Sequence, residues 1–206
     1  MINAIIFDID GTLIDSFEAN HEYVAEFMKA AGYSSPTLKE YATIYHLSTW
    51  DVIKTLTGLT DKKEIQKIWD LAQNFKYTET KFHKLNDGAK ETIQKFSERY
   101  PLGVVSNRSR KFIFESPLDT FKKYFQVSVA YEDTVNHKPH PEPLLLAAEK
   151  LGAKPMECAY IGDAETDIQA ACAAGMKMIL YGQTVLPGAD YTTPSLREVP
   201  ELIKQL

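Results

Sequence analysis

Short apolar runs alternate with amphipathic stretches over most of the chain. The runs are short and β-rich, as in strands of a parallel sheet that is covered on both faces. Two amphipathic stretches, 88–99 and 141–151, indicate helices, and Gly152 is placed to end the second one. This alternation predicts βαβ units with right-handed crossovers, and therefore an α/β core. The strand-like runs are 5–7, 101–107, 126–131, 158–163 and 176–182.

Residues 16–83 follow a helical pattern instead. Apolar side chains between Phe17 and Ala31 form one helical stripe, and Gly32 is placed to end that helix. We find no convincing strand in this segment, so an all-helical insert is expected to interrupt the core after its first strand. The predicted domains are a core, 1–15 and 84–206, and a helical domain, 16–83. The expected N-caps of further helices are Ser35 (before Pro36), Ser48 and Thr60.

Polar side chains follow the predicted strands at the points where they end. Functional groups of parallel α/β sheets gather beyond the carboxyl ends of the strands. Clustered acids repel one another unless a cation or a proton holds them, and oxygen ligands suit a hard ion such as Mg²⁺. The side chains concerned are Asp8 and Asp10 after the first strand, Ser106 and Asn107 after the second, Lys138 after the third, and Asp163 with Asp167 after the fourth.

Composition narrows the class of protein. The chain has 206 residues, a net charge of −5 and 44% hydrophobic residues, which argues for a full core and against a nucleic-acid or anionic-membrane binder. Its two cysteines, Cys158 and Cys172, suggest neither a disulfide framework nor a zinc site. No apolar run reaches membrane-spanning length and no basic leader is present, so a soluble cytoplasmic protein is expected.

Four motifs together resemble those of the haloacid dehalogenase superfamily of phosphotransferases. They are "DIDGT" at 8–12, Ser106 in "VVSN", Lys138 in "KPHPEP" and "GDAETD" at 162–167. The helical insert between the first two motifs is similar to the cap of the phosphoglycolate phosphatase-like subgroup. The resemblance implies a Rossmann-like core of three α/β/α layers with an inserted all-helical cap domain.

The resemblance also implies a role for each motif residue. Asp8 is expected to be the nucleophile that forms an aspartyl-phosphate, and Asp10 the general acid and base. Mg²⁺ is expected to be bound by Asp8, by the backbone carbonyl of Asp10 and by Asp163. The groups expected to bind phosphoryl oxygens are Lys138, Ser106, Asn107 and the backbone around Gly11 and Thr12.

Other side chains have more than one interpretation. Asp167 is expected to orient Lys138 or the metal site in preference to binding the metal directly. Asn107 could cap the next turn rather than bind phosphate. Arg108 and Arg110 could reach an anionic substrate, although we expect both on the solvated surface. The turn formed by His46, Ser48, Thr49 and Trp50 could overhang the site.

Several functions fit the motifs. A magnesium-dependent phosphatase acting on a small phosphorylated metabolite, phosphoglycolate-like or a sugar phosphate, is preferred. A sugar phosphomutase (β-phosphoglucomutase-like) or a pyrophosphatase on the same scaffold are the alternatives, and Thr12 favours the phosphatase over the mutase. Asp10 disfavours a dehalogenase, and the complete set of chemical residues disfavours a non-enzymatic binding module. The sequence leaves open whether the protein is a monomer or a homodimer.

Overall fold

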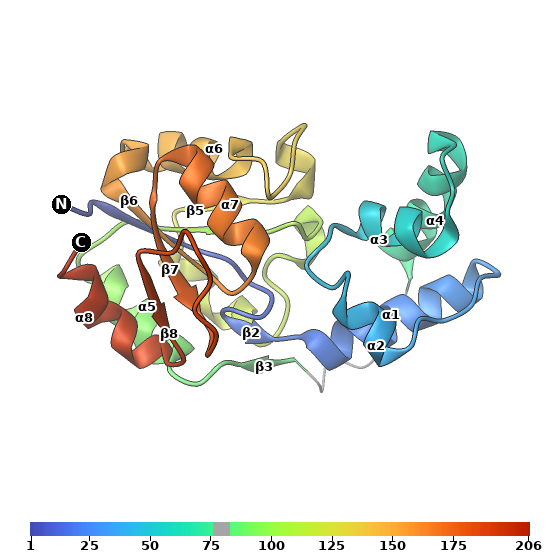
Figure 1. The fold of residues 1–206 in the computed structure, drawn as a ribbon, viewed down its shortest axis with the longest axis horizontal. Helices are drawn as coiled ribbons and strands as arrows, with labels where there is room; N and C mark the ends of the chain where they lie inside the picture. The colour runs from blue at the N-terminus through green and yellow to red at the C-terminus, as the bar shows by residue number, and fades with distance from the viewer. Residues whose placement is uncertain (76–82) are drawn as a thin grey trace. The chain divides into compact units, whose positions relative to one another are not determined.

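The computed structural model describes residues 1–75 and 83–206 (Figure 1). The chain forms two compact units, the first built from Met1–Asp15 and Lys84–Leu206, the second from Ser16–His83. Both chain termini belong to the first unit, which is the α/β core. Among the described residues no helix combines the length and the apolar character that crossing a bilayer requires.

The core is built on a six-stranded sheet in which every paired strand is parallel, as predicted. The order is β5-β4-β1-β6-β7-β8, so the first strand lies in the middle. Phe7 of β1 pairs in register with Val104 of β4 on one side and with Ile161 of β6 on the other. The last strand, β8, was not expected from the sequence. The strands are β1 (Ala4–Phe7), β4 (Leu102–Val105), β5 (Val127–Val129), β6 (Cys158–Gly162), β7 (Lys177–Tyr181) and β8 (Tyr191–Thr193).

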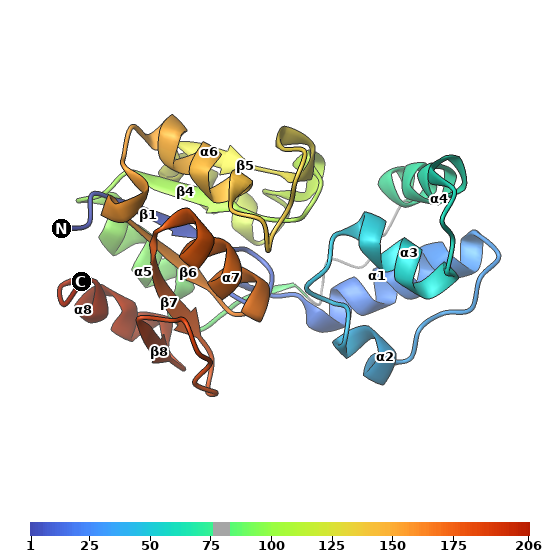
Figure 2. The ribbon, with the colours of Figure 1, turned by 45° about the horizontal axis from the view of Figure 1, so that its top comes forward.

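Helices cover both faces of this sheet (Figure 2). Ile5 and Phe7 of β1 face the layer that contains α5 and α8, whereas Ile6 faces the layer that contains α6 and α7. All three side chains are fully buried, so the near-continuous apolar run reflects burial on both faces. The three-layer α/β/α core is therefore confirmed. Its helices are α5 (Ala89–Ser97), α6 (Glu142–Leu151), α7 (Glu165–Ala174) and α8 (Val199–Ile203).

Short elements complete the core. Strands β2 (Ile14–Asp15) and β3 (Lys84–Leu85) pair antiparallel where the chain leaves the core and returns to it. Gly152 ends α6 in the left-handed conformation, as the sequence predicts. The 3₁₀ helices are η2 (Arg110–Phe112), η3 (Leu118–Tyr124), η4 (Tyr131–Asp133), η5 (Pro155–Glu157) and η6 (Leu196–Glu198).

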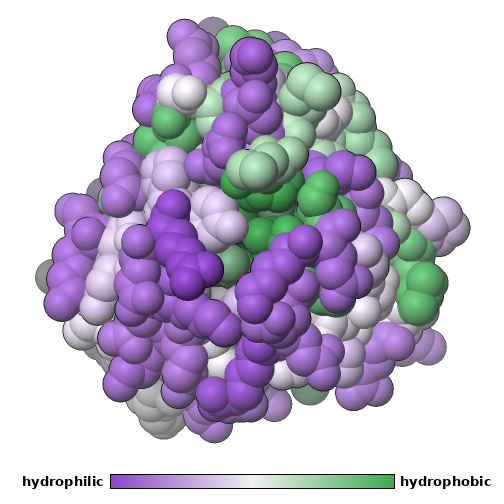
Figure 3. Space-filling view, turned by 90° about the vertical axis from the view of Figure 1, so that its left-hand side faces the viewer, coloured by the Kyte–Doolittle hydropathy of each residue, from purple (hydrophilic) through white to green (hydrophobic). Residues whose placement is uncertain are grey.

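The surface on the side of both termini is mainly hydrophilic, and smaller clusters of hydrophobic residues lie among the hydrophilic ones (Figure 3).

The second unit contains helices and no strand among its described residues. Buried side chains such as Phe27, Met28 and Ile53 form a hydrophobic cluster of its own, against which Trp50 packs. The function of this unit as a cap, and the position of the turn around Trp50 relative to the core, stay predictions. Its helices are α1 (Phe17–Ala30), α2 (Leu38–Ala42), α3 (Thr49–Thr57) and α4 (Lys62–Asn74).

Two of the three expected helix starts in this unit are wrong. Ser48 does cap α3, where its hydroxyl accepts the N–H of Asp51. No helix begins at Ser35, because its hydroxyl donates to the carbonyl of Ala25 instead. The next helix begins after Thr37, whose reciprocal capping box with Glu40 satisfies two backbone N–H groups. Likewise α4 is capped by Asp61 rather than Thr60, since the Asp61 carboxylate accepts two backbone N–H groups.

The junction between β6 and α7 is closely packed. Oδ2 of Asp167 accepts the backbone N–H groups of Asp163, at 3.2 Å, and of Ala164, at 3.1 Å, and so holds the turn that leads into the helix. Asp167 itself is completely buried. Gly162 lies against it so closely that an added Cβ would be 2.5 Å from its Cγ. Only a residue without a side chain fits at the end of β6.

We therefore expect Gly162→Ala to destabilise the core. A methyl group would displace the buried Asp167 carboxylate, and such overpacking typically costs about 1–3 kcal/mol in the free energy of unfolding. Gly182→Ala is the matched control, because a Cβ there meets no atom within 4 Å, and its effect should stay within about 0.5 kcal/mol. Urea unfolding followed by circular dichroism measures both, and equal stabilities of the two variants would contradict the packing described.

Candidate active site

The loop after β1 carries the first group of candidate residues. Asp8 follows the strand directly, and its backbone N–H donates to the carbonyl of Ile161 at 2.8 Å, which extends the pairing with β6. Gly11 has φ 75°, a left-handed conformation that lets the chain turn sharply here. Asn86 holds the turn, since its side-chain amide donates to the carbonyls of Gly11 and Thr12 at 2.9 and 2.8 Å. No motif or pattern in the sequence pointed to a role for Asn86.

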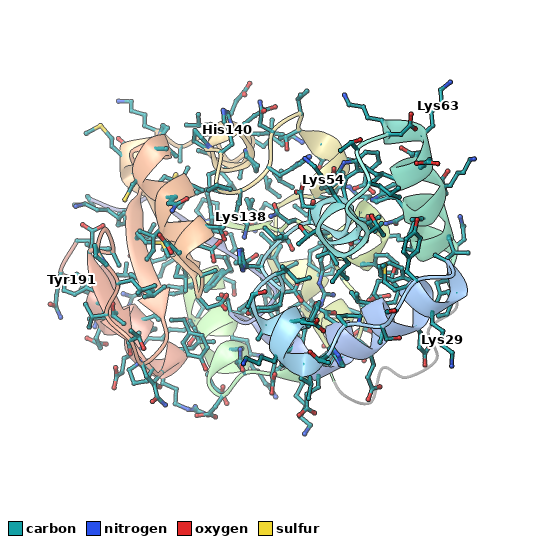
Figure 4. All side chains as sticks on the ribbon, turned by 45° about the vertical axis from the view of Figure 1, so that its right-hand side comes forward. Lys29, Lys54, Lys63, Lys138, His140 and Tyr191 are labelled. Atoms are coloured by element: carbon teal, nitrogen blue, oxygen red, sulfur yellow. The ribbon has the colours of Figure 1, made fainter. Side chains whose placement is uncertain are left out.

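Ion pairs of Lys138 join the loop after β1 to the first turn of α7. The Nζ atom of Lys138 lies 2.8 Å from Oδ1 of Asp8 and 2.7 Å from Oδ1 of Asp167. Only 8% of Lys138 is exposed, unlike Lys29 and Lys63, which point outward from the helical unit (Figure 4). Asp8 and Asp167 are buried as well. Two carboxylates and one ammonium therefore form a buried ion cluster, as charge neutralisation at this end of the sheet requires.

The hydroxyl of Tyr160 belongs to the same cluster and was not predicted. It donates to Oδ1 of Asp167 at 3.0 Å and accepts a hydrogen bond from Lys138 at 3.0 Å. Burial, together with the negative charges of Asp167 and Asp8, raises the pKa of Tyr160 well above its usual value, so the phenol keeps its proton. Because Tyr160 lies within a strand of apolar character, the sequence suggests only core packing for it.

Burial shifts the pKa values of Asp8 and Lys138 in opposite directions. It raises the pKa of Asp8 well above the usual carboxyl value, and the positive charge of Lys138 opposes that rise. For Lys138, burial lowers the pKa, but the charges of Asp167 and Asp8 outweigh it and raise the pKa above its usual value. The ammonium therefore stays protonated and presents a fixed positive charge beside Asp8.

Asp163 and Thr12 connect the first and fourth motifs. The Thr12 hydroxyl donates to Oδ1 of Asp163 at 2.9 Å. Thr12 is completely buried, whereas Asp163 is partly exposed. This bond crosses from the loop after β1 to the loop after β6, and it lies at the point where the strand order reverses.

The carboxylate of Asp10 lies in a separate ion pair. Arg108 binds both of its oxygens, with Nε 2.6 Å from Oδ2 and Nη2 2.6 Å from Oδ1. The Arg108 side chain is only 9% exposed, so the expectation that it lies on the solvated surface is wrong. Burial lowers the pKa of Arg108, but the charge and hydrogen bonds of Asp10, together with the charges of Glu115 and Asp8, outweigh burial and raise that pKa above its usual value. Arg110, in contrast, is exposed as expected and pairs with Asp133.

The end of β4 contributes the second motif. Ser106 is buried, and its hydroxyl accepts the backbone N–H of Arg108 at 3.2 Å. The side-chain amide of Asn107 donates to the carbonyl of Lys138 at 3.3 Å. Asn107 therefore ties the loop that carries Lys138 to the end of β4. Binding of phosphoryl oxygens by Ser106 and Asn107 stays a prediction.

The acidic side chains at this end of the sheet fit a divalent cation. Within the described residues, Asp8, Asp163 and Asp167 each have an oxygen within 4.8 Å of the others. An all-oxygen set of this kind suits Mg²⁺ or another hard ion. Asp167 is the least suited of the three, because Lys138 and Tyr160 occupy one oxygen and two backbone N–H groups the other.

The match to known proteins covers most of the chain. A family model described as "Haloacid dehalogenase-like hydrolase" matches residues 5–181. Phosphoglycolate phosphatase of Escherichia coli (strain K12) is 40% identical over 100 residues, which cover 47% of this chain and 39% of that protein. The match thus spans well under half the length of that relative. Pyrophosphatase PpaX of Bacillus pumilus is 31% identical over 186 residues, which cover 85% of this chain and 81% of that protein.

A solved structure agrees with these matches. The hydrolase of the haloacid dehalogenase superfamily, subfamily IA, variant 1, from Geobacter sulfurreducens PCA aligns with a TM-score of 0.73 at 30% identity. The alignment covers 98% of this chain and 96% of that one. The resemblance to the phosphoglycolate phosphatase-like subgroup and the prediction of an enzyme agree with these findings. The chain belongs to the haloacid dehalogenase-like hydrolase family.

Proposed function

We propose that this protein is a magnesium-dependent phosphatase that hydrolyses a small phosphomonoester through an aspartyl-phosphate. The observation that carries the proposal is the buried carboxylate of Asp8, which lies at the end of the central strand with the ammonium of Lys138 2.8 Å away. Asp163 lies near enough to share a cation with Asp8. A nucleophilic oxygen is thus held beside fixed positive charge, as phosphoryl transfer requires.

In the first half-reaction an oxygen of Asp8 attacks phosphorus, and the bond between phosphorus and the ester oxygen breaks. The leaving alkoxide takes a proton from Asp10. In the second half-reaction a water molecule attacks phosphorus and gives its proton to Asp10. The acyl-phosphate bond then breaks, which releases inorganic phosphate and restores Asp8. Asp10 has to leave the ion pair with Arg108 to serve in either step.

Groups around Asp8 hold the transferred phosphoryl group. Lys138 supplies charge, while the hydroxyl of Ser106 and the amide of Asn107 supply hydrogen bonds. The backbone of Gly11 and Thr12 supplies further N–H groups, and Asn86 keeps that turn in place. Asp167 orients Lys138 and the turn into α7, since both of its oxygens are already hydrogen-bonded.

Asp8, Asp163 and the backbone carbonyl of Asp10 are the groups that would hold Mg²⁺. When bound, the ion offsets the repulsion between the anionic nucleophile and the anionic substrate. The Thr12 hydroxyl donates a hydrogen bond to Oδ1 of Asp163 and so orients this carboxylate for metal binding. Asp8 keeps one oxygen on Lys138, which fixes the orientation of its carboxylate.

The substrate is proposed to be a small phosphorylated metabolite, such as phosphoglycolate or a sugar phosphate. Hydrolysis of pyrophosphate is the second candidate, favoured by the likeness to the Bacillus pumilus pyrophosphatase over most of both chains. A sugar phosphomutase would return the phosphoryl group to a sugar instead of water. Release of inorganic phosphate from a panel of phosphorylated metabolites, ranked by kcat/KM, separates these functions.

Replacing the nucleophile should abolish turnover. We expect Asp8→Asn to lower kcat to below about one-thousandth of the wild-type value, because the amide is nearly isosteric but cannot attack phosphorus. Phosphate release from p-nitrophenyl phosphate measures this. Asp119→Asn removes an exposed carboxylate from the same unit and should leave kcat unchanged. A folded Asp8→Asn protein that retained about a tenth of the activity would rule out covalent catalysis by Asp8.

Removing divalent metal should also abolish turnover. We expect activity to disappear in excess EDTA and to return when Mg²⁺ is added beyond the chelator. Asp163→Asn should raise the Mg²⁺ concentration for half-maximal activity by about tenfold or more, because it removes a charged ligand. The Asp119→Asn control should keep the wild-type Mg²⁺ requirement. Undiminished activity in EDTA would remove the metal from the mechanism.

A further inference from the structure

Arg108 and Asp10 form an ion pair that joins two loops at the end of the sheet. The two residues are 98 positions apart in the chain, and two parallel N–H···O contacts of 2.6 Å connect them. The exposed fractions of their side chains are only 9% and 19%. Bidentate pairing of this kind is the strongest form of arginine–carboxylate contact and fixes the orientation of both groups.

The guanidinium of Arg108 is also held from its other side. Nη1 donates to the carbonyl of Phe112 at 3.1 Å and lies 3.8 Å from the carboxylate of Glu115. The backbone N–H of Arg108 donates to the hydroxyl of Ser106, at the end of β4. These contacts do not involve Asp10, so they would keep the guanidinium in place if Asp10 turned away. The edge formed by Nε and Nη2 would then face the site without its carboxylate.

Asp10 cannot serve the reaction while both of its oxygens lie on Arg108. It has to rotate away to reach the leaving oxygen or the attacking water. Such a rotation leaves a largely buried guanidinium without its closest counter-charge, which is unfavourable unless another anion replaces it. Carboxylate and phosphoryl groups both match the two-pronged edge that Arg108 presents. A substrate that carries such a group would exchange places with Asp10.

We propose that Arg108 is a specificity-determining residue that binds a second anionic group on the substrate and thereby releases Asp10. The substrate class is a phosphate whose leaving group bears a carboxylate or a further phosphoryl group. This inference rests on the proposed phosphatase function and deepens it. A phosphate ester with an uncharged leaving group lacks the replacement anion and leaves Asp10 on Arg108.

A pair of substrates that differ in one charge tests the inference. 2-Hydroxyethyl phosphate serves as the reference with an uncharged leaving group. The probe, which carries a second anionic group on its leaving group, is 2-phosphoglycolate or pyrophosphate, whichever the wild type turns over faster. The measured quantity is the ratio of kcat/KM for the probe to kcat/KM for the reference. Because both substrates are hydrolysed by the same molecules, a partly misfolded preparation does not change the ratio.

We expect the wild-type ratio to be at least about tenfold, because a site built to pair a polar group discriminates against substrates without it. Arg108→Gln should bring the ratio close to one, mainly by lowering kcat/KM for the anionic probe. Arg108→Lys keeps the charge but loses the two-pronged edge, so it should give an intermediate ratio. Arg110→Gln is the matched control, since it removes an exposed arginine from the same connection, and should keep the wild-type ratio.

Two results would overturn the inference. If Arg108→Gln kept the wild-type ratio, with equal losses on both substrates or with none, Arg108 would be a structural residue only, and the phosphatase function would be intact. Failure of the wild type to release phosphate from any of the three compounds in the presence of Mg²⁺ would instead overturn the proposed function, and this inference with it. The two failures are therefore distinguishable.

Discussion

The ammonium of Lys138, buried between Asp8 and Asp167, is the interaction on which the rest of the site depends. Two carboxylates at the end of a sheet would repel each other in a poorly solvated environment, and burial alone would favour protonation of Asp8. The positive charge of Lys138 opposes both effects. Removing one partner from such a buried cluster typically costs about 3–5 kcal/mol, because the others are left uncompensated. The cluster therefore fixes the loop after β1, the loop before α6 and the first turn of α7 together.

The topology of the sheet explains why these groups meet. Strand β1 lies between β4 and β6, so the loops that follow all three strands emerge at the same end. Close packing then sets the positions of the loops. The absence of a side chain at Gly162 leaves room for Asp167, and Asn86 holds the turn of Gly11 and Thr12 through hydrogen bonds. The carboxylate of Asp8 and the ammonium of Lys138 are thereby held in fixed positions. Positioning of this kind supplies much of the catalytic effect in phosphoryl transfer.

The sequence predicted the parts of this arrangement that follow from local pattern. Apolar runs indicated the buried strands, and the residues after them, such as Asp8 and Asp163, were correctly placed beyond the strand ends. Pairings over long separations left no local signal. Arg108 and Asp10 are 98 positions apart, and Asn86 and Gly11 are 75 apart. Helix starts at Thr37 and Asp61 were missed because neighbouring residues offered equally good capping side chains.

The proposed mechanism requires that the carboxylate of Asp8, held by Lys138, becomes covalently phosphorylated. Rapid acid quenching of a reaction with a substrate that carries a radiolabelled phosphoryl group, followed by peptide mapping, tests it directly. We expect label on the peptide that contains Asp8, and hydroxylamine should release it, as it does from an acyl phosphate. Phosphate release without protein-bound label at any quench time, or label on another residue, would contradict it.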